Sequence, residues 1–205
     1  MTAIIDYGVG NLFSVEKAFS AMDENVVLTS DLNEIENADK LILPGVGAFG
    51  DCMKNLEERK FIPLILNHIE KNKPLLGICV GLQLLFEGSE ESPNVKGLGV
   101  FKGTVKKINA PNLKIPHMGW NSVSIRNSEL KNCNLFEGLK KDSYFYFVHS
   151  YHAVPEDENI IIATTQYGEK LTAAIANKNV YATQFHPEKS GDVGLELLKN
   201  FSKIH

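Results

Sequence analysis

The sequence predicts a single α/β domain over residues 1–205, in which helices cover both faces of a mostly parallel sheet that antiparallel strands extend. Short apolar runs alternate with helical patterns through the first half of the chain, as parallel βαβ units require. The second half changes to β-rich segments separated by turn signals. Neither half contains an internal repeat, and a chain of 205 residues that is 43% hydrophobic can fill one core.

In the first half, the apolar runs predict strands at residues 3–7, 26–29, 40–43 and 75–79. Asn11 and Asp31 are expected to cap the first two helices, because short polar side chains accept hydrogen bonds from the first turn. The third strand is expected to stop at Pro44. One or two helices should follow, interrupted near Pro63, and residues 82–87 should be helical.

In the second half, alternating and apolar segments predict a further set of strands. These lie at residues 103–108, 121–125, 144–151, 160–165, 171–176 and 180–185. A final helix is expected over residues 193–201. Together these segments place the antiparallel extension of the sheet after the parallel part.

The composition excludes several classes of function. A net charge of −4 without a basic tract makes nucleic acid an unexpected partner. No apolar run approaches the ~20 residues that span a bilayer, and the N-terminus lacks the basic region of a signal peptide. Cys52, Cys79 and Cys133 form neither a CxxC pair nor a zinc spacing. We therefore expect a cytoplasmic protein without a metal site or a membrane segment.

Cys79 is the strongest candidate for a nucleophile. It ends an apolar strand, precedes a helical segment and lies between Gly77 and Gly81. Glycines at these positions allow the tight strand–nucleophile–helix turn that exposes a reactive side chain, and backbone N–H groups at such a turn can bind an oxyanion. A buried structural cysteine is the commoner role at a strand end. We assign this role to Cys52 and Cys133, because neither has a glycine two residues before it and another two residues after it.

His186 and Glu188 are the candidates for the base and for the group that orients it. The histidine follows a predicted strand, and Pro187 fixes the turn that brings in the carboxylate two residues later. A carboxylate there can hold the imidazole tautomer and stabilise the imidazolium. A lone His-Pro-Glu run is more often a surface turn, but together with the cysteine it indicates a triad.

Residues 43–50 (LPGVGAFG) contain the G-x-G-x-x-G pattern of dinucleotide-binding loops. The pattern follows the third predicted strand rather than the first, and no acid follows at the ~20 residues that a ribose contact needs. We interpret the loop as a place where backbone N–H groups approach a substrate carbonyl. No cofactor is expected.

These motifs belong to a longer series that runs along the whole chain. In order, it comprises residues 6–11 (DYGVGN), 43–50 (LPGVGAFG), 77–83 (GICVGLQ), 116–121 (PHMGWN), 146–151 (YFVHSY) and 184–190 (QFHPEKS). The series resembles the class I, or triad, glutamine amidotransferases and, within them, the glutaminase subunits of imidazole glycerol phosphate synthases. The resemblance implies a flavodoxin-like fold. One departure is residues 80–82 (VGL), where the family more often has Leu-Gly-Met.

The resemblance implies hydrolysis of glutamine to glutamate and ammonia. Cys79 would attack the side-chain amide and form a glutamyl thioester, His186 would transfer the protons, and Glu188 would orient His186. The resemblance places the oxyanion donors at Val46, Gly47 and Val80. It places the glutamine-binding groups at Gly47, Gln83, Ser150 and Tyr151. The strand that carries the donors at Val46 and Gly47 is expected to rest in an inactive arrangement, and a peptide flip near Val46 is expected to switch it to the active one.

Ammonia in water is mostly ammonium, which is no nucleophile, so it must pass directly to an acceptor site. The resemblance implies that a (β/α)₈-barrel synthase subunit provides this site in a heterodimer that makes imidazole glycerol phosphate for histidine biosynthesis. The residues implied at the interface are Asn11, Met118, Trp120 and Lys189. For Trp120, packing in the core is about equally compatible with the sequence.

Three other functions remain open on the sequence. A paralogous glutaminase subunit could supply ammonia to a barrel-like enzyme that amidates a nucleotide sugar for surface polysaccharide. A regulatory binding module with a vestigial site is a second alternative, which the complete triad disfavours. A cysteine hydrolase of peptides is a third, which Gln83 and the motifs of the second half disfavour.

Overall fold

A computed structural model describes residues 1–9, 12–22, 25–126 and 134–204. An eight-stranded sheet runs through the molecule in the order β2-β1-β3-β4-β12-β11-β10-β7. Its strands are β1 (Thr2–Ile5), β2 (Val26–Thr29), β3 (Lys40–Gly45), β4 (Leu75–Cys79), β7 (Ser124–Ile125), β10 (Ile161–Tyr167), β11 (Glu169–Asn177) and β12 (Val180–Thr183). The strands from β2 to β12 in that order are parallel, and β11, β10 and β7 are antiparallel. This confirms the predicted fold class.

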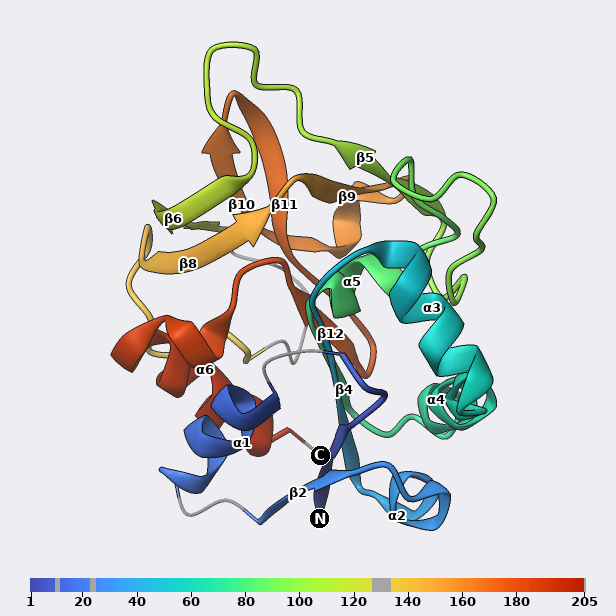
Figure 1. The fold of residues 1–205 in the computed structure, drawn as a ribbon. Coiled ribbons are helices and arrows are strands. Elements are labelled where there is room, and N and C mark those ends of the chain that lie inside the picture. Colours follow the sequence, from blue (N-terminus) through green and yellow to red (C-terminus); the bar gives the residue numbers. More distant parts are fainter. Residues whose placement is uncertain (10–11, 23–24, 127–133, 205) are drawn as a thin grey trace.

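Helices cover both faces of the parallel strands (Figure 1). They are α1 (Leu12–Ser20), α2 (Leu32–Asn37), α3 (Phe49–Glu58), α4 (Phe61–Glu70), α5 (Val80–Leu84) and α6 (Gly191–Ser202). Helices α1 and α6 lie on one side of the sheet, and α3, α4 and α5 lie on the other. Strands β1, β4 and β12 are buried along their whole length, as expected for strands that are covered on both faces.

Two small antiparallel sheets lie over the upper end of the main sheet in Figure 1, where β4 leads into α5. One pairs β5 (Gly103–Lys107) with β9 (Tyr151–Pro155), and the other pairs β6 (His117–Ser122) with β8 (Tyr144–His149). In a doubly wound sheet, ligands bind at the carboxyl ends of the parallel strands. The small sheets therefore enclose the end of the fold where a site is expected.

The structure corrects several predicted boundaries in the first half. Strand β3 continues through Pro44 instead of stopping there, and Pro44 pairs with Ile78. The break between α3 and α4 is at Lys60, which has a left-handed φ of 61°. Pro63 lies in the first turn of α4, where an N–H has no acceptor within the helix, so proline is tolerated there.

Other boundaries differ near the predicted site. The helix expected over residues 82–87 is α5, which begins immediately after Cys79. The single strand expected over residues 144–151 is two strands that break at Ser150. The strand expected from residue 121 begins at His117. The predicted cap Asp31 is confirmed, because its side chain accepts from the backbone of Asn33 and Glu34. Asn11 lies outside the described residues.

In the described parts of the chain, no helix combines the length and the hydropathy that crossing a membrane requires.

Candidate active site

The predicted nucleophile lies at a sharp turn between β4 and α5. Cys79 adopts φ 56° and ψ −111°, a region that residues with a side chain rarely enter and that costs roughly 1–3 kcal/mol. Such strain persists only where the surrounding structure imposes it. The turn therefore has the strand–nucleophile–helix geometry that the sequence predicts.

The glycines around Cys79 allow this turn to pack against β3. A Cβ atom at Gly81 would lie 1.9 Å from the Leu43 carbonyl oxygen, and one at Gly77 would lie 2.9 Å from the Gly81 carbonyl oxygen. A Cβ at Gly45 would lie 2.7 Å from the Gly81 nitrogen. Only glycine fits at these three positions, so the sequence encodes the close approach of β3 to the turn at Cys79.

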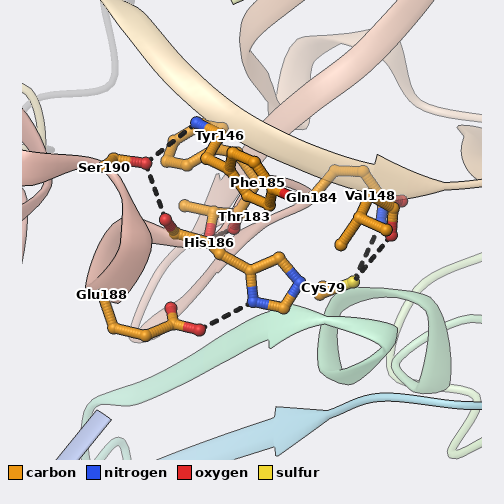
Figure 2. A network of polar contacts seen from close by, with 9 residues as sticks. All are labelled: Cys79, Tyr146, Val148, Thr183, Gln184, Phe185, His186, Glu188 and Ser190. Atoms are coloured by element: carbon orange, nitrogen blue, oxygen red, sulfur yellow. Dashed lines mark hydrogen bonds and ion pairs between the residues drawn. The ribbon is translucent and has the colours of Figure 1, made fainter. Parts of the chain in front are cut away.

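His186 and Glu188 form the predicted pair directly after β12. Nδ1 of His186 and Oε1 of Glu188 are 2.7 Å apart, and both side chains are buried. The other ring nitrogen, Nε2, has no hydrogen-bond partner among the described residues and points toward Cys79 (Figure 2). The arrangement leaves one nitrogen free to exchange a proton with the thiol or a substrate.

The electrostatic surroundings favour the protonated ring of His186. Burial alone lowers its pKa, but the adjacent Cys79 and Glu188 outweigh burial and raise the pKa to about 10. The sulfur of Cys79 on one side and the carboxylate of Glu188 on the other stabilise an imidazolium between them. The ring can therefore act as a general acid at neutral pH.

Ser190 holds the His186 turn against strand β8. Its hydroxyl donates to the His186 carbonyl at 2.6 Å and accepts from the Tyr146 backbone N–H at 3.0 Å (Figure 2). The His186 N–H in turn donates to the Tyr146 carbonyl at 2.9 Å. The position of the predicted base thus depends on β8, an element far from it in the sequence.

A cavity of about 270 Å³ opens beside Cys79. It brings together all the predicted oxyanion and substrate residues, with two members of the predicted triad. Its walls include Val46, Gly47, Cys79, Val80, Gln83, Ser150, Tyr151 and His186. A larger hollow of about 580 Å³ near Pro74 and Lys178 contains none of these residues, and we assign it no chemistry.

The cavity wall also contains residues that the sequence analysis did not select, notably Glu91 and His149. Glu91 accepts a hydrogen bond from the Phe49 N–H at 2.8 Å, which holds its carboxylate at the start of α3. No local pattern distinguishes Glu91 from its neighbour Glu90. His149 had a signal, because it lies in the motif that also contains Ser150.

Gln83 is held in place by the protein. Its Nε2 donates to the Tyr151 carbonyl at 3.0 Å and to Oε1 of Gln184 at 3.1 Å. Nε2 of Gln184 lies 3.8 Å from the Cys79 sulfur. The amide of Gln83 therefore connects Tyr151, in the cavity wall, to Gln184, which lies next to the sulfur of Cys79.

Three of the four residues predicted at a partner interface, Met118, Trp120 and Lys189, lie on the surface. Met118 is 61% exposed and Trp120 is 56% exposed, so core packing of Trp120 is ruled out in this structure. The Trp120 ring lies against Tyr146, with ring centroids 6.3 Å apart, and Nζ of Lys189 lies 5.9 Å from the centre of the Tyr146 ring. We call Met118, Trp120, Tyr146 and Lys189 the β6 patch. It adjoins the Ser190 contact that holds His186.

Comparison with known proteins gives consistent results. The family model described as "Glutamine amidotransferase class-I" matches residues 3–204. The chain is 50% identical over 207 residues to "Imidazole glycerol phosphate synthase subunit HisH 1" of Methanococcus maripaludis, covering 100% of both chains. It is 52% identical over 203 residues to "Imidazole glycerol phosphate synthase subunit HisH" of Pyrococcus furiosus, covering 98% of each.

Among solved structures, the chain is similar to one described as "Crystal structure of glutamine amidotransferase", with a TM-score of 0.74. The alignment covers 98% of each chain at 18% sequence identity. At that identity, the likeness shows a shared fold.

Proposed function

Because the chain belongs to the class I glutamine amidotransferases, we propose that it hydrolyses glutamine to glutamate and ammonia as the glutaminase subunit of an imidazole glycerol phosphate synthase. The observation that carries this proposal is the meeting of Cys79, His186 and Glu188 beside one cavity. The relatives that match over their full length bear the name of that synthase subunit, which favours histidine biosynthesis over the amidation of a nucleotide sugar.

In the proposed reaction, the Cys79 thiolate attacks the side-chain carbonyl carbon of glutamine. The carbonyl oxygen becomes an oxyanion, which backbone N–H groups at Val80 and at Val46 or Gly47 stabilise. Protonated His186 donates from Nε2 to the departing nitrogen, so that ammonia leaves and a glutamyl thioester remains. His186 then accepts a proton from water, whose oxygen attacks the thioester and releases glutamate and the thiolate.

Glu188 keeps His186 in the orientation and tautomer that this sequence needs, because its carboxylate fixes Nδ1 as the hydrogen-bond donor. The remaining walls supply groups for the amino-acid part of glutamine. Glu91 provides a negative charge that matches an α-ammonium group. Gln83, Ser150 and Tyr151 frame the same space, and their contact with glutamine is part of the proposal.

The product ammonia explains why the chain needs a partner, because it must reach an acceptor site before it becomes ammonium in water. We infer that the partner is a (β/α)₈-barrel synthase subunit and that it docks on the β6 patch in a heterodimer. An exposed tryptophan that packs beside a tyrosine is typical of an interface anchor. Asn11, the fourth predicted interface residue, lies outside the described residues. A cytoplasmic location is also part of the proposal.

A glutaminase assay tests the proposal directly. Glutamate release is measured for the purified chain alone, and for the chain with the barrel subunit and that subunit's ligand. We expect slow hydrolysis alone and much faster hydrolysis in the complex. Cys79→Ala is the control that should abolish both rates. Intact glutamine in the presence of an assembled complex would contradict the proposal, and activity in Cys79→Ala would contradict the assignment of the nucleophile.

A further inference from the structure

Two buried side chains hold the backbone of residues 44–47 from the side away from the cavity. The Tyr7 hydroxyl donates to the Pro44 carbonyl oxygen at 2.6 Å. The Cys52 thiol donates to the Val46 carbonyl oxygen at 3.5 Å. Both side chains are 0% exposed, and neither Tyr7 nor Cys52 lines the cavity. The proposed reaction uses neither of them.

These contacts determine where the neighbouring N–H groups point. In a trans peptide the C=O and N–H groups point in opposite directions. When Cys52 holds the Val46 carbonyl toward the core, the Gly47 N–H must point away from the core. Val46 and Gly47 both line the cavity that contains Cys79. The thiol thus orients a donor toward the side on which the proposed oxyanion forms.

Gly47 itself does little to restrain this peptide. Gly47 has a φ of +93°, and apart from Gly47 and its two chain neighbours no described residue has an atom within 4 Å of the position that its Cβ would occupy. A glycine in open space with a positive φ can adopt several orientations at similar energy. The hydrogen bonds to the carbonyls of Pro44 and Val46 are therefore specific restraints on the backbone between them.

Both donors keep their protons at neutral pH. Burial raises the pKa of Tyr7 well above its usual value and raises the pKa of Cys52 to about 11. Each group has a single proton on its heteroatom and lies within reach of one carbonyl oxygen, and the two side chains also contact each other. The pair is thus matched to the pair of carbonyls.

We propose that Tyr7 and Cys52 are positioning residues for glutamine hydrolysis, which hold the carbonyls of Pro44 and Val46 so that the intervening backbone presents its N–H groups to the oxyanion at Cys79. The proposal rests on the proposed function and deepens it. Neither residue touches the substrate, so each acts through the backbone. A purely structural role would affect stability without a selective effect on turnover.

The test measures kcat and KM for glutamine in the complex with the barrel subunit, for Tyr7→Phe, Cys52→Ala and Cys52→Ser. We expect kcat to fall at least about fivefold in Tyr7→Phe and Cys52→Ala with little change in KM, because oxyanion donors act mainly in the transition state. Cys52→Ser restores a donor to the Val46 carbonyl and should recover most of the rate. Tyr181→Phe, which removes the hydroxyl of another buried tyrosine, on β12 and outside the lining of the Cys79 cavity, is the matched control and should keep kcat.

A second measurement separates the backbone from the nucleophile. Alkylation of Cys79 by iodoacetamide needs the thiolate but no oxyanion donor. Its rate in Tyr7→Phe and Cys52→Ala, measured by mass spectrometry, should therefore stay within about twofold of the rate in the protein without substitutions. In protein labelled with ¹⁵N-glycine, the Gly47 amide signal should move in Cys52→Ala and return in Cys52→Ser. Unchanged kcat, an equal loss of alkylation or an unmoved Gly47 signal would overturn the proposal. Failure of the glutaminase proposal would look different from failure of the positioning proposal. The complex without substitutions would then leave glutamine intact, while the Gly47 signal would still report on the backbone.

Discussion

Nδ1 of His117 lies 2.9 Å from Nε2 of His149, and the direction of this hydrogen bond is fixed by its surroundings. Nδ1 of His149 lies 2.8 Å from the Tyr151 carbonyl, which can only accept, so His149 donates from Nδ1 and accepts at Nε2. His117 must then donate from Nδ1, and its Nε2 accepts from Asn121 at 3.1 Å. Burial keeps both rings neutral by lowering the pKa of His117 to about 4 and that of His149 to about 3. A directed chain therefore links β6 to the cavity wall.

This pairing predicts strong coupling between the two rings. Either His117→Phe or His149→Phe alone leaves a buried polar group without its partner, at a cost of about 1–3 kcal/mol. The double variant loses both groups together and should cost less than the sum of the single variants by at least about 0.5 kcal/mol. Urea unfolding of the four proteins measures this coupling. Additive losses would show that the hydrogen bond contributes nothing specific.

His149→Phe should also affect binding of glutamine more than chemistry. The Tyr151 carbonyl would lose the donor from His149 and keep only the one from Gln83. We therefore expect KM for glutamine to rise several-fold with a smaller change in kcat. His152→Phe is a suitable control, because His152 is also a buried histidine but lies on β9 and does not line the cavity.

The pH profile of glutaminase activity depends on Glu188. The pKa of His186 is raised to about 10, so the imidazolium acid persists through neutral pH and is lost only as the pH rises toward that value. Cys79 and Glu188 both raise this pKa, and in Glu188→Gln the contribution of the carboxylate is gone, so the ring loses its proton at lower pH. The alkaline limb of kcat should move toward neutrality, and kcat at pH 7 should fall at least about a hundredfold. An alkaline limb that stays in place would contradict the role of Glu188.

Much of this site was predictable because the residues that form it are local in sequence. The turn at Cys79 is specified by glycines within two residues of it, and His186 and Glu188 are two residues apart. The parallel sheet was also predictable, because each of its strands is a short apolar run. Pro44 was wrongly expected to end β3, because sequence alone does not show that β4 pairs with it or that Tyr7 binds its carbonyl.

The residues that the sequence analysis missed depend on contacts between distant segments. His117 and His149 meet because β6 and β8 pair, with His117 opposite His149 in the register. The sequence around Cys52 is that of an ordinary core residue, and its contact with Val46 is visible only in three dimensions. Glu91 enters the cavity through a loop without a sequence signature. In each case the partner is set by tertiary structure rather than by local pattern.

The glycine at position 81 should be irreplaceable. A Cβ there would lie 1.9 Å from the Leu43 carbonyl oxygen, which is backbone and cannot easily move. Gly81→Ala should lower the free energy of unfolding by about 3 kcal/mol or more and abolish hydrolysis. The control is Gly88→Ala, where the nearest atom to the added Cβ is 3.5 Å away, so the change should stay within about 0.5 kcal/mol. Equal effects of the two substitutions would contradict the packing argument.

Stability should decrease in mild acid because several histidines are buried in the neutral form. Burial lowers the pKa of His68 to about 4, against 6.5 for the ordinary side chain. The unfolded chain therefore binds more protons than the folded one between these values, so the free energy of unfolding falls as the pH drops from 6.5 toward 4. His68→Gln keeps a donor for the Pro74 carbonyl and cannot titrate. It should recover at least about 1 kcal/mol of the acid-induced loss in urea unfolding at pH 4.5.

Assembly with the barrel subunit should depend on Trp120. Its ring is 56% exposed and packs against Tyr146, whose backbone is tied to the His186 turn through Ser190. A large aromatic side chain that a partner buries typically contributes about 2 kcal/mol or more, so Trp120→Ala should weaken the complex at least about thirtyfold.

Titration calorimetry of the two subunits measures the Trp120→Ala effect, and Leu32→Ala is the control. Leu32 is a hydrophobic residue of similar exposure, 45%, at the start of α2, which lies at the end of the molecule opposite to β6 in Figure 1. Because Tyr146 connects the β6 patch to His186, the proposed base, Trp120→Ala should also reduce the activation of glutamine hydrolysis at saturating partner. Full activation in the saturated complex would show that the tryptophan contributes affinity alone.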